Sequence, residues 1–143
     1  MGIFAGDIET TGLLEDLKTQ EYPKLHNFGG KCMETGKEIL FTPDPQGSRA
    51  LVVGGDARHI SEFPAFLKQG HTLVMHNGIL YDAEALKVLK VPEITHCPII
   101  DTLWISYALQ PERLKHGLEE YGVEYGIPKP KITDWENQTQ QDY

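Results

Sequence analysis

The order of the strands and helices predicted along the chain is the feature that most limits its fold. Apolar runs bounded by turn residues predict strands at 3–9, 26–33 and 37–43, with a hairpin turn at 34–37. A further short strand at 72–76 lies among helical patterns. Hairpin-linked strands pair antiparallel, whereas strands separated by helices pair in parallel. The sequence therefore predicts an α/β domain with a mixed central sheet flanked by helices.

Helical patterns dominate the second half of the chain. Proline, glycine and capping side chains mark the ends of these helices, with Asn77 and Asp101 as the expected caps. The helices are expected at 59–70, 77–90, within 99–110 after a strand end, and at 114–126. Residues 10–17 are expected to form a turn and an irregular segment, and residues 54–56 a turn.

Length and composition limit the class of protein. A chain of 143 residues with 40% hydrophobic residues is expected to form one domain around one core. The net charge of −8 argues against broad neutralisation of nucleic-acid phosphates, although a divalent metal held by carboxylates would reverse the local potential. The two cysteines, with no signal-peptide pattern and no long apolar run, predict a cytoplasmic protein with no membrane segment.

Two acidic residues, Asp7 and Glu9, stand at the end of the first predicted strand. Residues two apart in a strand point to the same side, so the two carboxylates repel each other unless a cation lies between them. An alternative is that Glu9 lies in the following loop and both acids are solvated. Carboxylates without nearby histidine or cysteine clusters favour Mg²⁺ or Mn²⁺. A site for two such ions needs a further acid, and Asp82 in the second turn of the helix at 77–90 is the candidate.

Four segments in a fixed order carry a family resemblance. DIETTGLL, MHNGILYD, IIDTLWIS and LKHGLEEYG together resemble the 3′ to 5′ exonucleases of the DnaQ-like (DEDD) superfamily, in particular the proofreading domains of bacteriophage family-A DNA polymerases. The first two motifs of that family are present as Asp7-x-Glu9 and Asn77-x-x-x-x-Asp82. The resemblance spans 4–143 and implies a ribonuclease-H-like fold.

The resemblance also implies a role for each motif residue. Asp7 would bridge two Mg²⁺ or Mn²⁺ ions, Glu9 would bind the ion that carries the attacking water, and Asp82 would serve the second ion partly through water. The implied reaction removes nucleoside 5′-monophosphates from a DNA 3′ end, with a DNA polymerase as a possible partner in the host cytoplasm.

Substrate contacts are implied in two segments, with simple packing as an equally open alternative. The loop that would receive the 3′-terminal nucleotide consists of Thr10, Thr11, Gly12, Leu13 and Leu14. The side chains that would line the strand path are His76, Asn77 and Tyr81.

The third family motif is incomplete in this sequence. Tyr143 stands where its catalytic tyrosine is expected, and the aspartate that follows four residues later is absent from the sequence. Asp134, Asp142 or another polypeptide could supply this fourth carboxylate. The alternative function is therefore a weakly active or non-catalytic module that binds nucleic-acid 3′ ends or a polymerase.

Three other residues have structural interpretations. His116 does not fit the histidine form of the third motif, because Tyr121 stands where that motif needs an aspartate. Tyr121 and Tyr125 are expected in the core, on the apolar face of the helix at 114–126.

Overall fold

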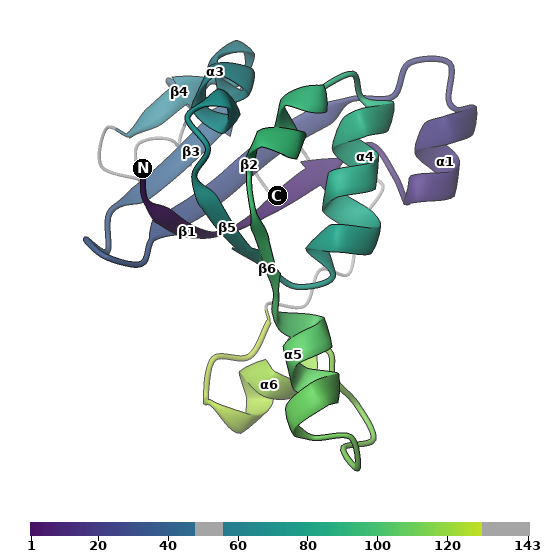
Figure 1. Cartoon of the computed structure of the whole chain (residues 1–143). Coiled ribbons are helices and arrows are strands. Elements are labelled where there is room, and N and C mark those ends of the chain that lie inside the picture. The colour runs from purple at the N-terminus through teal and green to yellow at the C-terminus, as the bar shows by residue number, and fades with distance from the viewer. Residues whose placement is uncertain (48–55, 130–143) are drawn as a thin grey trace.

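A six-stranded mixed sheet organises the molecule (Figure 1). The structure, a computed structural model, describes residues 1–47 and 56–129. The strand order is β4-β3-β2-β1-β5-β6. The strands are β1 Ile3–Thr10, β2 Leu25–Cys32, β3 Glu38–Thr42, β4 Ala57–His59, β5 Thr72–Met75 and β6 Ile99–Asp101.

The pairing of the strands confirms the predicted α/β class. β1, β2 and β3 form an antiparallel meander, and the turn between β2 and β3 uses Gly36 with a φ of 73°. β5 pairs with β1 in parallel, and β6 pairs with β5 in parallel. The short strand β4 pairs in parallel with β3. Because β1 and β5 run in the same direction, their carboxyl ends meet at one edge of the sheet.

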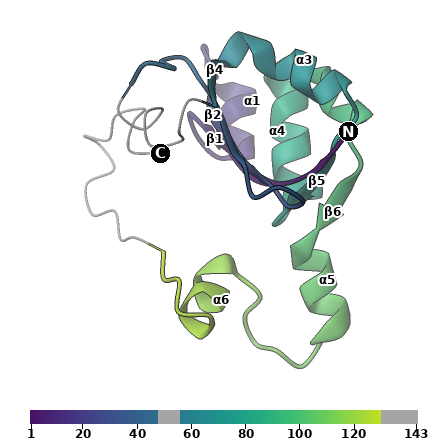
Figure 2. The same cartoon turned by 90° about the vertical axis from the view of Figure 1, so that its left-hand side faces the viewer.

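Helices cover one face of the sheet. Figure 2 shows α1, α3 and α4 on the same side of the strands. The α-helices are α1 Leu14–Thr19, α3 Phe63–Lys68, α4 Ala83–Val88, α5 Thr102–Leu109 and α6 Leu118–Glu124. Shorter turns are the 3₁₀ turns η1 Ile60–Glu62 and η3 Pro92–His96 and the π-helical turn η2 Gly78–Asp82.

The core between the sheet and these helices is aromatic. Phe28, Phe41 and Phe63 are completely buried, and the rings of Phe28 and Phe63 stack with their centroids 4.7 Å apart. A Cβ at Gly6 would approach the Phe28 ring to 2.7 Å, so the centre of β1 has no room for a side chain on this face. β1 is therefore held tightly against the core, which fixes the direction of its outward-facing residues.

Neither α1 nor β4 was predicted. The expectation of a turn and irregular segment at 10–17 holds for 11–13 and is wrong from Leu14 on, because α1 begins there and buries Leu17 to 1% exposure. The aspartate of its first turn, Asp16, accepts a hydrogen bond from the Leu13 backbone. Six residues are too few to show helical periodicity clearly in a sequence. β4 has only three residues and no alternation, and it follows the expected turn at 54–56, where residues 54 and 55 lie outside the described residues.

Helices α5 and α6 project away from the rest of the molecule (Figure 1). The prediction that Tyr125 is a core residue is wrong, since its exposed fraction is 70%. Tyr121 is only partly buried. The reason is that α6 lies beside α5 and away from the sheet (Figure 1), where the Tyr121 hydroxyl bonds Ser106 Oγ, so the described apolar residues of α6 do not join the core.

Candidate active site

β1 presents Asp7 and Glu9 on the face of the sheet opposite the aromatic core. Ile8 between them is buried in that core at 4% exposure. A groove of about 390 Å³ runs along the outward face, lined by Asp7, Glu9 and Gly29 among other residues. Gly29 is the partner of Asp7 on β2, and a Cβ there would meet no atom within 4 Å. The space beside Asp7 is therefore open to a ligand.

The π-helical turn η2 brings Asp82 to β1. The turn follows Asn77, whose φ of 62° is left-handed, a conformation that asparagine adopts more readily than most residues. A Cβ at Gly78 would lie 2.5 Å from the Cβ of Met75, so only glycine fits there. The widened turn places Asp82 toward the sheet, where its exposed fraction is 1%. π-Helical turns are found often at functional sites.

Asp82 lies close enough to Asp7 for the two carboxyl groups to interact. Burial, followed by the negative charge of Asp7, raises the pKa of Asp82 to about 7. The negative charge of each carboxylate opposes ionisation of the other, so the pair is less unfavourable when Asp82 carries a proton. Asp82 Oδ1 is buried and has no hydrogen-bond partner within the described part of the chain. A cation bound between the two carboxylates would relieve the same repulsion.

Asp101 fixes the path of the chain into this turn. Its Oδ1 accepts hydrogen bonds from the backbone nitrogens of Asn77 at 2.9 Å and Leu103 at 3.0 Å. Its Oδ2 accepts a third from the nitrogen of Ile79 at 3.0 Å. The bond from Leu103 confirms Asp101 as the helix cap of α5, and the other two show a second role that the sequence did not reveal. The prediction that Asn77 caps the following helix with its side chain is wrong, because Asn77 makes no such bond.

The loop at 10–14 is tied to η2 by Tyr81. The hydroxyl of Tyr81 lies 3.0 Å from Thr10 Oγ1 and donates to the carbonyl oxygen of Gly12 at 3.0 Å. Thr10 Oγ1 itself donates to the same carbonyl at 2.7 Å. The loop at 10–14 and Tyr81, both expected at the substrate or in packing, therefore meet in one hydrogen-bonded cluster. The tyrosine hydroxyl is already used, so its role here is to position the loop.

Within this loop the two leucines differ. The side chain of Leu13 is 72% exposed, whereas Leu14 packs against the core. Thr11 is held by Gln20, whose side chain bonds both the hydroxyl at 2.6 Å and the carbonyl oxygen of Thr11 at 3.1 Å. Gln20 has no sequence motif that could have identified it. Leu13 is thus the apolar side chain of the loop that is available to a ligand.

The remaining predicted residues lie beside the pair or outside the described residues. His76 follows β5, and its Nδ1 lies 2.9 Å from Thr102 Oγ1 at the start of α5. Tyr143, Asp134 and Asp142 lie in segment 130–143, outside the part of the chain that the structure describes.

The donor set at this site is made of carboxylates. Over residues 1–47 and 56–129, no three histidine, cysteine, aspartate or glutamate side chains are grouped closely enough to hold a metal. The contact of Asp7 with Asp82, together with the buried Oδ1 of Asp82, fits one hard cation with oxygen ligands. Glu9 lies two residues further along β1 and lines the same groove.

Comparisons with known proteins add no family. No protein-family model and no curated protein matches the chain. Among the described residues, no helix has the length and apolar character needed to cross a membrane.

Proposed function

We propose that this protein is a metal-dependent 3′ to 5′ exonuclease with a ribonuclease-H-like fold, acting on DNA single strands or frayed 3′ ends. The observation that carries the proposal is the contact between the buried Asp82 and Asp7. Burying a carboxyl group next to another one costs free energy, and a divalent cation compensates both charges at once.

Asp7, Asp82 and Glu9 are the residues that would hold Mg²⁺ or Mn²⁺, in one or two sites. Ions bound there would supply charge stabilisation and lower the pKa of water at the scissile phosphodiester. The chain itself would orient the substrate. The open space over Gly29 gives a phosphate access to Asp7, and the exposed Leu13 offers an apolar surface for the terminal base.

The position of the loop at 10–14 supports action at a chain end. The Tyr81 hydroxyl donates to the carbonyl of Gly12, so this loop is linked to the turn η2 that carries Asp82. A terminal nucleotide placed against Leu13 would bring its phosphate toward Asp7. A separately encoded proofreading part of a phage-like replication system, with a DNA polymerase as its partner in the host cytoplasm, is the setting that we propose.

A second candidate is a module that binds 3′ ends or a polymerase with little or no hydrolysis. It is favoured by one observation, that the described residues do not bring a third acid into a metal-binding group. The two candidates share the substrate and differ in turnover.

A single assay separates them. An oligonucleotide labelled at its 5′ end and the same oligonucleotide labelled at its 3′ end are incubated with Mg²⁺ or Mn²⁺ and with EDTA. The exonuclease gives a ladder from the first substrate and immediate release of the labelled mononucleotide from the second. Binding without a ladder would favour the module, and neither binding nor cleavage would exclude both.

The matched pair of variants is Asp82→Asn and Glu84→Gln. Both acids lie at the start of the same helix, but Glu84 is solvent-exposed and pairs with Lys87 at 2.6 Å. Exposed ion pairs contribute little to stability. Loss of cleavage in Asp82→Asn with normal cleavage in Glu84→Gln assigns the activity to the site.

A further inference from the structure

The groove that holds Asp7 continues along the outward face of the sheet toward the amino end of β1. Its lining there includes Ala5 on β1 and Lys31 on β2. Asp7 is opposite Gly29 in the antiparallel pairing, and Ala5 is opposite Lys31. Because residues two apart on a strand share a face, Lys31 lies on the face of Asp7, and the step from Gly29 to Lys31 is about 7 Å.

The surface between Asp7 and Lys31 carries almost no side chain. Gly29 has none, and a Cβ built there would meet no atom within 4 Å. Ala5, the partner of Lys31, adds one methyl group. The backbone of an extended polymer can therefore approach the sheet closely between these two charged residues.

The charges in this groove differ between its two ends. Among the described residues that line it, Lys31 is the one with a basic side chain, whereas Asp7, Glu9 and Glu38 are acidic. Lys31 Nζ lies 3.9 Å from Glu38 Oε1, a long contact for an ion pair, and the Lys31 side chain is 60% exposed. Such exposed pairs contribute little to stability, so Lys31 can exchange Glu38 for another anion at small cost. The groove thus offers a cation site at Asp7 and an anion site at Lys31.

The order of these features along β1 corresponds to the order of groups along a DNA strand. The loop at 10–14 follows the carboxyl end of β1, Asp7 lies before that end, and Ala5 with its partner Lys31 lies before Asp7. In the proposed function the loop receives the 3′-terminal nucleotide and Asp7 lies at the scissile phosphodiester. A stretched single strand covers the step from Gly29 to Lys31 with one nucleotide, so the next phosphate in the 5′ direction falls at Lys31.

We propose that Lys31 binds the phosphate on the 5′ side of the scissile phosphodiester, with the DNA strand lying along β1 and its 3′ end at the loop. The inference rests on the proposed function and adds to it the direction of the strand and its shortest fully bound form, a trinucleotide. Lys31 contacts the substrate away from the reacting atoms, so it contributes to binding and not to the chemical step. An apolar protein segment in the same groove would bury Asp7 and Lys31 without compensating their charges.

The proposal is tested with thymidine dinucleotides and trinucleotides in Mn²⁺, each with a phosphorothioate at the terminal phosphodiester to slow hydrolysis. Lys31→Gln weakens binding of the trinucleotide about threefold, the size expected for an exposed ion pair. The same variant binds the dinucleotide as the wild type does, because the dinucleotide has no second phosphate. Lys31→Arg keeps the charge and the trinucleotide affinity. Equal weakening of the two oligonucleotides by Lys31→Gln overturns the proposal.

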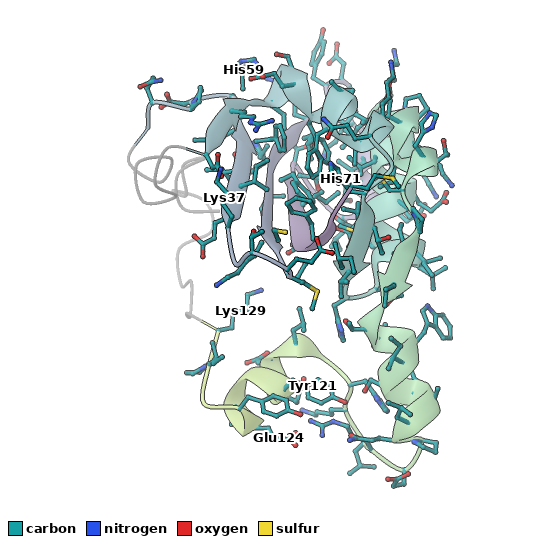
Figure 3. All side chains as sticks on the ribbon, turned by 60° about the vertical axis from the view of Figure 1, so that its left-hand side comes forward. Lys37, His59, His71, Tyr121, Glu124 and Lys129 are labelled. Atoms are coloured by element: carbon teal, nitrogen blue, oxygen red, sulfur yellow. The ribbon has the colours of Figure 1, made fainter. Side chains whose placement is uncertain are left out.

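The matched control is Lys37→Gln, which changes the net charge by the same amount. Lys37 belongs to the same hairpin, directly before β3 (Figure 3). Its Nζ pairs with Asp56 Oδ2 at 2.9 Å, and it lines a different cavity together with Phe66 and His71. Lys37→Gln therefore leaves both affinities unchanged. A loss equal to that of Lys31→Gln would show that only the overall charge matters, and would overturn the contact.

The phosphate itself is identified by making it neutral. A trinucleotide with an uncharged methylphosphonate in place of its second phosphodiester binds the wild type about threefold more weakly, as expected for the same ion pair, and Lys31→Gln shows no further loss. Losses that add would overturn the pairing of Lys31 with this phosphate. The slope of log affinity against log salt for the normal trinucleotide falls by about 0.7 in Lys31→Gln, because one fewer phosphate is neutralised.

Failure of this inference differs from failure of the proposed function. Cleavage from the 3′ end by the wild type, with unchanged trinucleotide affinity in Lys31→Gln, overturns the assignment of Lys31 and leaves the exonuclease in place. Neither binding nor cleavage of any DNA by the wild type overturns both. Since the Lys31 side chain is 60% exposed, its replacement leaves the melting temperature unchanged, and a melting curve checks this.

Discussion

The backbone nitrogen of Asn77 donates a hydrogen bond of 2.9 Å to Asp101 Oδ1, between the ends of the parallel strands β5 and β6. This bond supports the left-handed conformation of Asn77, from which the π-helical turn continues to Asp82. Asp101, which does not belong to the carboxylate pair, therefore determines where the buried carboxyl group of Asp82 lies.

The first prediction concerns this support. Asp101→Ala leaves the backbone nitrogens of Asn77, Ile79 and Leu103 without their acceptor. A buried donor without a partner costs about 1–3 kcal/mol, and we expect a loss of this order in the free energy of unfolding, measured with urea. Asp101→Asn keeps one acceptor oxygen and should lose less. Equal stability of the two variants and the wild type would show that the turn holds its shape without Asp101.

The second prediction is a dependence of stability on pH. The pKa of Asp82 is about 7 in the folded chain, against an ordinary value of 3.8. Between these values the folded chain keeps a proton that the unfolded chain has released, so this group stabilises the fold below about pH 4 and that stabilisation is lost as the pH rises to about 7. Urea unfolding of the metal-free protein from pH 4 to 8 should show this decline.

Asp82→Asn provides the comparison, because asparagine does not titrate. The difference in unfolding free energy between Asp82→Asn and the wild type should grow in favour of the variant as the pH rises from 4 to 7, and then level off. The other titrating groups contribute equally to both proteins, so this difference in unfolding free energy reports on Asp82 alone. A difference that is independent of pH would contradict the raised pKa.

The parts of the fold that could be predicted from the sequence depend on short-range rules. The hairpin at Gly36 and the strand at Asp7 follow from turn chemistry and from apolar runs, and Asp101 is recognisable as a helix cap from its place before an apolar helix. Spacing in the strand also indicated that Asp7 and Glu9 share one side. These are local choices, made by residues close together in the chain.

The parts that could not be predicted depend on contacts between distant segments. The left-handed Asn77 is stabilised by Asp101, which lies 24 residues away, so the sequence around Asn77 suggested an ordinary helix cap. Tyr125 has an apolar helical setting, but the sheet does not extend under α6. The link from Tyr81 to Gly12 spans 69 residues and has no motif of its own.

The third prediction is metal binding. Mn²⁺ or Mg²⁺ at millimolar concentration should raise the melting temperature of the wild type at pH 8, because a ligand of the folded state stabilises it and relieves the repulsion of Asp7 and Asp82. Asp7→Asn should be more stable than the wild type without metal and gain little on its addition. An unchanged melting temperature of the wild type, in a folded sample, would count heavily against the site.

The fourth prediction concerns Tyr81. Tyr81→Phe removes the hydroxyl that donates to the carbonyl of Gly12, and one such bond contributes about 0.5–1.5 kcal/mol. We expect a small loss of stability by urea unfolding and a larger fall in the cleavage rate, since the loop is no longer fixed to the turn that carries Asp82. The control is Tyr22→Phe, because Tyr22 is 73% exposed. Equal rates for both variants would rule out positioning by Tyr81.

The last prediction concerns Leu13, which is 72% exposed although it precedes a helix that packs into the core. An exposed leucine adds little to folding, so Leu13→Ala should leave the melting temperature nearly unchanged. If the Leu13 side chain lies against the terminal base, the same variant should weaken binding of a single-stranded 3′ end by about 1–3 kcal/mol, by analogy with other side-chain contacts to bases.

Met33→Ala is the control for Leu13→Ala, since Met33 is 61% exposed and follows the end of β2 that lies away from the carboxylate pair. If Leu13 and Asp7 act on different parts of the same nucleotide, as proposed, Leu13→Ala should raise KM more than it lowers kcat, whereas Asp7→Asn should lower kcat. A fall in kcat alone for Leu13→Ala would mean that the loop positions the reacting phosphate and does not hold the base.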